Sequence, residues 1–196
     1  MIVTADEVNR SFRGTLDFLN RRAEGLRAFD LSERGFWRSF AAIWLTLPAY
    51  VVSLAIERLR LGLLAPDKPL LSSVWLDLAV AFGHVASFLV LPLAMIVVTR
   101  RFNMTDRFAP FVIVTNWVSV IGLLLLSLPA VLLLAGWATP ALATLFTLAF
   151  AVIVLRVQWF ATMVTLGVSS GFALGVVGLG LVLNGFVGAL VRALTG

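Results

Sequence analysis

The sequence contains no cysteine, only one histidine and few charged residues of either sign. The absence of cysteine among 196 residues excludes disulfides, thiolate catalysis and cysteine-ligated iron–sulfur clusters. Charged residues make up 13% of the chain and apolar residues 61%, whereas a soluble domain has about 25% charged residues. This composition excludes a soluble globular enzyme, a disordered chain and a coiled coil, and it favours an integral membrane protein.

The few charges are also unevenly placed. Thirteen of the 25 charged residues precede Phe40, and the 89 residues from Phe108 onward contain only Arg156 and Arg192. A helix that crosses a hydrocarbon core of about 30 Å needs about 20 apolar residues, and the chain has room for five such helices. We predict an all-α integral membrane protein, a five-span helical bundle. Its spans are expected at residues 36–56, 73–98, 110–134, 141–162 and from a turn at 166–171 to residue 191.

An amphipathic cytoplasmic helix is predicted over residues 4–29, ahead of the first span. Thr4 and Glu7 have the spacing of a capping box. Apolar residues then recur at helical spacing and form one stripe: Val8, Phe12, Leu16, Leu19, Ala23 and Leu26. The stripe suits either the lipid interface or packing against protein, and the pattern leaves both open. The predicted domains are residues 1–31, the cytoplasmic helix, and 32–196, the transmembrane domain.

The distribution of basic residues predicts the orientation in the membrane. With the N-terminus in the cytoplasm, eleven Lys and Arg residues lie inside and four lie outside, as the positive-inside rule favours. We therefore expect a multi-pass protein of the bacterial inner membrane with a periplasmic C-terminus. This anchoring role also accounts for the excess of arginine, so no nucleic-acid partner is predicted.

Polar residues inside predicted spans are the candidate functional residues, because burying them in lipid is costly. They are Asp77, His84, Asn116, Arg156, Gln158 and Asn184. Helix-to-helix contacts are the simpler interpretation, and a path for a solute or a proton is the alternative.

Depth in the membrane limits which of these residues meet. Asp77 enters the second span from outside and is expected near Arg58, Arg60 or Asn184, whereas Arg156 lies at the depth of Asn116.

His84 lies two helical turns from Asp77 on the same face of the second span. One histidine with few acids nearby cannot build a multi-ligand metal site. We predict a hydrogen-bonded core histidine, with a protonation switch as the alternative. No metal, cofactor or catalytic residue is predicted.

The fifth span carries small residues at regular spacing. Five glycines form the pattern: Gly167, Gly171, Gly175, Gly178 and Gly185. Small residues let helix backbones approach closely in lipid. The pattern predicts a close helix contact, either inside this chain or along the seam of a homodimer. Gly180 falls off this face and is expected to point toward lipid.

Three short motifs resemble the Yip family, the Ypt/Rab-interacting membrane proteins. Residues 30–37, Asp-Leu-Ser-Glu-Arg-Gly-Phe-Trp, look like the family's Asp-Leu-x-Gly-Pro-Phe-Trp entrance to the first span, although one residue longer and with Arg34-Gly35 in place of Gly-Pro. Residues 122–129 are similar to its Gly-Tyr-x-Leu-x-Pro stretch, with Leu123 in place of Tyr. Residues 166–169 look like the turn before the last span in bacterial members.

The resemblance implies the fold, the topology and a non-enzymatic organising role. Eukaryotic members of the family act in vesicle traffic with small GTPases, a role that does not transfer to a bacterial chain. We expect a scaffold or accessory component in membrane organisation, whose partners are the lipid bilayer and either other membrane proteins or a second copy of the chain. A small transporter or permeability protein is the alternative, and an intramembrane enzyme ranks third.

Overall fold

The computed structural model describes residues 3–64 and 74–195, and every regular element in these ranges is helical. Five segments are long and apolar enough to cross a membrane, namely Glu33–Gly62, Val74–Arg101, Thr105–Leu134, Pro140–Leu166 and Ser170–Thr195. The predicted all-α bundle with five spans is therefore confirmed, with boundaries that differ by a few residues. Ser73, the predicted start of the second span, lies outside the described residues. So does Lys68, one of the four basic residues expected on the outer side.

The first span consists of α2 (Glu33–Ala41), the 3-10 segment η2 (Ala42–Thr46) and α3 (Leu47–Leu64). Pro48 lacks an N–H, so an uninterrupted α-helix would leave the carbonyl of Trp44 without a donor. The tighter 3-10 winding resolves this, because the N–H of Leu47 donates to that carbonyl instead.

The entrance to the first span is tightly built. Ser32 caps α2, with its hydroxyl accepting a hydrogen bond from the N–H of Gly35 at 3.2 Å. A Cβ on Gly35 would overlap the backbone carbonyl of Asp30. Hydrogen bonds from the side chain and then the backbone of Ser32 also lower the pKa of Asp30. Only glycine therefore fits at position 35.

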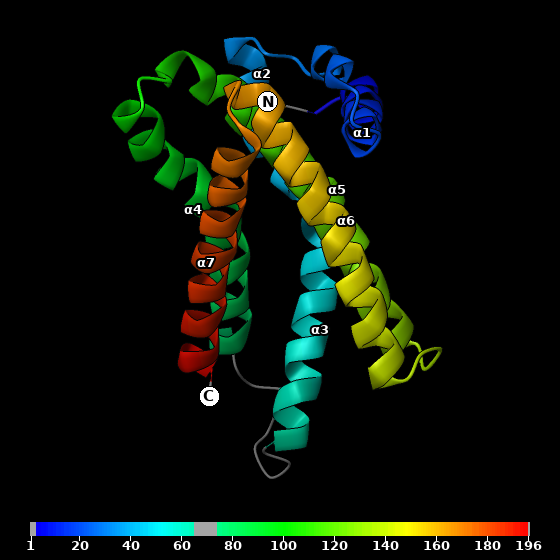
Figure 1. Ribbon diagram of the computed structural model, residues 1–196. Coiled ribbons are helices and arrows are strands. Elements are labelled where there is room, and N and C mark those ends of the chain that lie inside the picture. Colours follow the sequence, from blue (N-terminus) through cyan, green and yellow to red (C-terminus); the bar gives the residue numbers. More distant parts are fainter. Residues whose placement is uncertain (1–2, 65–73, 196) are drawn as a thin grey trace.

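The other four spans pack as two pairs. The helices α4 (Val74–Arg101) and α7 (Ser170–Thr195) form one pair, and α5 (Phe108–Leu134) and α6 (Pro140–Leu166) form the other. Figure 1 shows α6 and α7 meeting near the turn that joins them and diverging toward the opposite end of the bundle, with α3 behind the fork. The N-terminal helices and the C-terminus lie at opposite ends, as an odd number of spans requires.

The turn between α6 and α7 and the one between α4 and α5 lie at the N-terminal end of the bundle (Figure 1). A short 3-10 segment, η3 (Thr105–Arg107), leads into α5. Gly167 ends α6 in the left-handed conformation, with φ of 63°, and lies against the guanidinium of Arg107. The glycine is required at this position by its backbone conformation.

The N-terminal segment is a helical hairpin, so the prediction of one helix over residues 4–29 is wrong beyond Leu19. The helix α1 spans Ala5–Leu19, capped by Thr4 as expected, and the 3-10 segment η1 spans Ala23–Ala28. Between them Arg21 takes a positive φ of 57° and reverses the chain. The two arms touch backbone to backbone, since a Cβ on Gly14 would lie 2.8 Å from the carbonyl oxygen of Gly25.

The helix α1 has three faces, where the sequence predicted two. Five residues are buried against the rest of the protein: Glu7, Ser11, Gly14, Thr15 and Phe18. The apolar stripe lies beside this face, and within it Phe12 is 47% and Leu16 42% exposed. The remaining face carries the charges, including Arg10 and Arg13. The helix therefore packs against protein through Phe18 and small or polar residues. Val8, Leu19 and Leu26 of the stripe also contact the hydrophobic core, while Phe12 and Leu16 stay largely uncovered.

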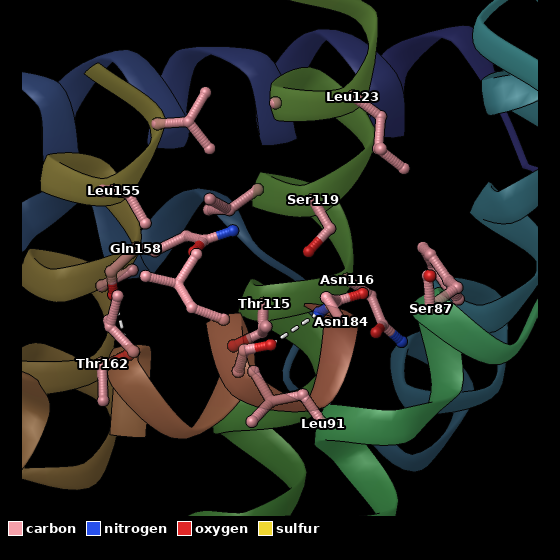
Figure 2. A pocket seen from close by; sticks show the side chains of 18 of the residues that line it. Ser87, Leu91, Thr115, Asn116, Ser119, Leu123, Leu155, Gln158, Thr162 and Asn184 are labelled. Atoms are coloured by element: carbon pink, nitrogen blue, oxygen red, sulfur yellow. Dashed lines mark hydrogen bonds between the residues drawn. The ribbon is translucent and has the colours of Figure 1, made fainter. Parts of the chain in front are cut away.

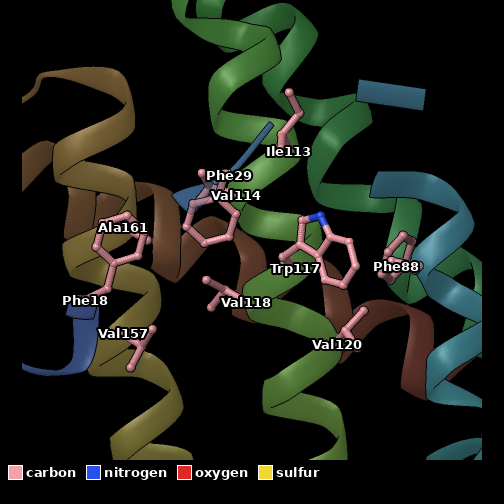
Figure 3. Packing of buried hydrophobic residues seen from close by; sticks show 11 residues of the cluster. Phe18, Phe29, Phe88, Ile113, Val114, Trp117, Val118, Val120, Val157 and Ala161 are labelled. Carbon is pink, nitrogen blue, oxygen red and sulfur yellow. The ribbon is translucent and has the colours of Figure 1, made fainter. Parts of the chain in front are cut away.

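One hydrophobic cluster joins the hairpin to the membrane-spanning helices, as Figure 3 shows. The ring of Phe18 stacks on Phe29 of the hairpin at 5.8 Å between centroids and meets Phe160 of α6 edge-on at 6.0 Å. The same cluster contains Trp117 of α5 and Phe88 of α4. The N-terminal segment thus shares its core with the spans, and the predicted domain boundary at residues 31/32 stays a prediction.

The glycine pattern of the fifth span does not mediate packing within the chain. A Cβ on Gly171, Gly175, Gly178 or Gly185 would meet nothing within 4 Å. Gly180, expected to point toward lipid, is buried instead, and its Cβ would lie 3.4 Å from Leu91 of α4. The internal-packing interpretation is wrong because α7 presents its other face to α4, and only the homodimer alternative stays open.

The close helix contacts are made by two other glycines. Gly83 of α4 lies against the side chain of Val191 in α7, and Gly122 of α5 lies against Val154 in α6. A Cβ on Gly122 would lie 2.9 Å from Val154 Cγ1. The small residue stands on one helix and the β-branched residue on its partner, so no repeat in either sequence segment signals the contact.

Candidate functional site

The four helices α4, α5, α6 and α7 enclose a cavity of about 310 Å³ inside the span region. Figure 2 shows polar side chains from all four helices around it. These are Ser87, Thr115, Asn116, Ser119, Gln158, Thr162 and Asn184. None of the described residues that line the cavity carries a charge, and the rest of the lining is largely Leu, Val and Ala.

Three of the four lining hydroxyls differ from the other hydroxyls of the spans in how they are bonded, whereas the fourth, that of Thr162, donates to the carbonyl of Gln158 in its own helix at 2.7 Å. Elsewhere in the interiors of the described spans, Ser and Thr donate to a backbone carbonyl of the preceding turn, as Thr147 does to Ala143 and Thr99 to Met95, at 2.9 and 2.7 Å. The hydroxyls of Ser87, Thr115 and Ser119 make no such bond. The lining side chains therefore retain unused hydrogen-bonding capacity that faces the cavity.

The three carboxamide side chains in the lining also have hydrogen-bonding groups that the protein does not use. Gln158 makes no side-chain hydrogen bond with any described residue. Asn116, only 1% exposed, donates from Nδ2 to Ser39 Oγ at 3.0 Å, and Asn184 donates from Nδ2 to the carbonyl of Gly180 at 2.9 Å. Both asparagines keep their Oδ1 acceptors open. The cavity thus presents hydroxyls and carbonyl oxygens, without formal charge.

A polar path leads from the cavity toward the N-terminal hairpin. Asn116 bonds to Ser39 of α2, and the neighbouring Arg38 places its Nη1 atom 3.3 Å from the Oε2 atom of Glu7 in α1. The Glu7 side chain is almost fully buried. A buried carboxylate needs an opposing charge, and Arg38 supplies one. The hairpin is thereby held to the first span directly beside the cavity.

Asp77 and His84 lie in a separate polar cluster between α3 and α4. Arg58 Nη2 donates to Asp77 Oδ1 at 2.6 Å, which confirms Arg58 among the three expected partners. His84 Nε2 lies 2.7 Å from the hydroxyl of Thr46, and its ring meets that of Tyr50 at 5.6 Å between centroids. The predicted hydrogen-bonded core histidine is observed, and the protonation switch stays untested.

The structure does not contain the other contacts that the sequence predicted for the polar residues of the spans. Arg60 pairs with Glu57 in its own helix, and Asn184 faces the cavity with Gln158 and Asn116. Arg156 does not join them, because it lies on the exposed face of α6. That face also carries Phe160, one turn away, which packs on α1. Within the described part of the chain Arg156 makes no ion pair or hydrogen bond.

The sequence missed Ser87, Thr115 and Ser119 as site residues. Serine and threonine are common in membrane helices, where they normally bond to their own backbone, so their presence alone carries no signal. Their place around the cavity and the lack of a bond to their own helix distinguish these three from the other hydroxyls of the spans, and both depend on the tertiary structure.

The chemistry available at the cavity is hydrogen bonding to a neutral group. Among the described residues, no group of three or more His, Cys, Asp or Glu side chains is placed to hold a metal ion. Comparison with family models, curated proteins and solved structures finds no match. The resemblance to the Yip family therefore stays a prediction from the three motifs.

Proposed function

We propose that this chain is a non-enzymatic protein of the bacterial inner membrane with Yip-like topology, which acts as a scaffold or accessory component in membrane organisation. The observation that carries the proposal is the docked N-terminal hairpin. Its buried face is fixed to the spans by Phe18 and the Glu7–Arg38 pair, while the charged face and Phe12 and Leu16 remain available. A rigid amphipathic helix at one end of a bundle suits contact with lipid headgroups or with a membrane partner.

Affinity capture tests this proposal. The full-length chain is captured in mild detergent, and the co-purifying proteins are quantified by mass spectrometry. We expect a membrane protein at a fixed molar ratio, and its amount should fall at least about tenfold, the equivalent of 1.4 kcal/mol, in the Phe12→Asp/Leu16→Asp variant. Thr144→Asp, also at an exposed helix position but far from the hairpin, is the control. Recovery of the chain alone, or equal capture by both variants, contradicts the scaffold role.

The orientation is tested by reporter fusions. Fusions after Gly62 and at the C-terminus should report a periplasmic location, and a fusion at Asn103 a cytoplasmic one. The expectation follows from the excess of basic residues at the N-terminal end of the bundle. A cytoplasmic C-terminus with a periplasmic Asn103 would reverse the proposed topology.

A small permeability protein is the second candidate, and the uncharged polar cavity favours it. Proteoliposomes containing the chain would then take up glycerol or urea faster than empty vesicles in a stopped-flow swelling assay. Ser119→Phe, which fills the cavity, should abolish the difference. Equal rates with and without the chain exclude this candidate for both solutes.

A further inference from the structure

The cavity contains hydrogen-bonding groups that the protein itself leaves unused. Three hydroxyls and one glutamine lack partners among the described residues, and Asn116 and Asn184 retain free Oδ1 atoms. In a low-dielectric environment each unpaired polar group costs free energy. Open carbonyl oxygens accept hydrogen bonds only, so a complementary occupant must supply donors such as hydroxyl or amide hydrogens.

The lining also limits the charge and size of the occupant. None of the described side chains in the lining is ionisable, so none of them would offset the desolvation of a charged group. A volume of about 310 Å³ is at the lower end of the range for small-molecule sites. Leu91, Leu123 and Leu155 line the same space beside the polar groups and form a surface that water alone would wet poorly. The occupant is therefore neutral and combines a polar part with an apolar part.

The cavity reaches the outer surface of the bundle between α6 and α7. Leu181 and Asn184 of α7 line it and are at the same time exposed, Leu181 by 54%. The two helices diverge here, as Figure 1 shows, and Figure 2 places Gln158 and Asn184 on opposite sides of the space. At this depth a span is surrounded by lipid. An occupant can thus enter sideways from the bilayer.

We propose that the cavity between α4, α5, α6 and α7 binds an uncharged hydroxylated amphiphile from the membrane, of the monoacylglycerol type. The hydroxyls bond to the polar side chains, Asn116 and Gln158 among them. The acyl chain covers the leucines and leaves between α6 and α7. This inference does not depend on the scaffold role, because it rests on the cavity and not on the hairpin.

Photolabelling tests the site directly. The full chain is placed in phosphatidylcholine nanodiscs with a monoacylglycerol whose acyl chain carries a diazirine, and labelled peptides are identified by mass spectrometry. We expect labels on α6 near Leu155 and on α7 near Leu181. Excess 1-monooleoylglycerol should suppress them, whereas methyl oleate, which lacks hydroxyls, and oleate, which is charged, should not.

Two variants complete the experiment. Thr115→Val/Gln158→Leu keeps the side-chain sizes and removes two hydrogen-bonding groups, so labelling should fall about tenfold, as expected for the loss of two ordinary hydrogen bonds. Thr147→Val is the matched control, because that hydroxyl bonds to its own helix and does not line the cavity. Equal suppression by methyl oleate, labels spread over all exposed helices, or full labelling of the double variant would overturn the proposal. If the double variant fails to fold, the competition by 1-monooleoylglycerol, methyl oleate and oleate on the unaltered chain still tests the proposal.

Discussion

Replacing Gly83 by isoleucine should lower the thermal stability of the detergent-solubilised protein far more than replacing Gly175 in the same way. Gly83 faces Val191 where α4 crosses α7, and an added side chain would enter space that valine already occupies. Valine is β-branched and has little freedom at χ1, so the helices must move apart. Overpacking of this kind costs about 1–3 kcal/mol.

The comparison separates packing from helix propensity. Both substitutions replace a glycine inside a helix and change propensity alike, but a Cβ on Gly175 meets nothing within 4 Å. Gly122→Ile, at the crossing of α5 with α6, should resemble Gly83→Ile. The readout is the midpoint of thermal unfolding followed by circular dichroism. Equal shifts for Gly83 and Gly175 would mean that the close crossing does not contribute to stability.

The second large effect is expected at Arg38. Replacing it by methionine removes the cation that faces the buried Glu7 carboxylate. Breaking a buried ion pair from one side costs about 3–5 kcal/mol, and because Arg38 is partly exposed we expect about 3 kcal/mol. The hairpin should then undock, and limited proteolysis should cut the chain between η1 and α2 at a higher rate.

Two further variants identify the cause. Arg34→Met makes the same chemical change one turn earlier in α2, at an exposed position, and should leave the cleavage rate nearly unchanged. Glu7→Gln in the Arg38→Met background removes the uncompensated charge and should restore much of the docking. If Arg34→Met accelerates cleavage as much as Arg38→Met, the effect comes from net charge and not from the buried pair.

The sequence alone determined the class of the protein and its helices. Apolar runs of this length have no stable alternative to helices in lipid, because only helices satisfy the backbone of each segment internally. The cap at Thr4 and the turn at Gly167 could be predicted for a similar reason, since each depends on neighbours within a few residues. The pairing of Asp77 with Arg58 could also be predicted, because the position of each residue along its span sets its depth in the membrane.

Only the tertiary structure decided which faces of the helices meet. The reversal at Arg21 depends on a contact between Gly14 and Gly25, eleven residues apart, and no local pattern predicts it. Local sequence patterns also do not show which helix face the glycines of α7 present to a neighbour. Nor do they show that the hydroxyls of Ser87, Thr115 and Ser119 line a cavity. In lipid every apolar face is equally acceptable, so hydrophobicity sets where a helix lies but not how it is rotated. The rotation depends on the shapes of neighbouring helices, and it brings the uncharged polar groups of four spans around one cavity.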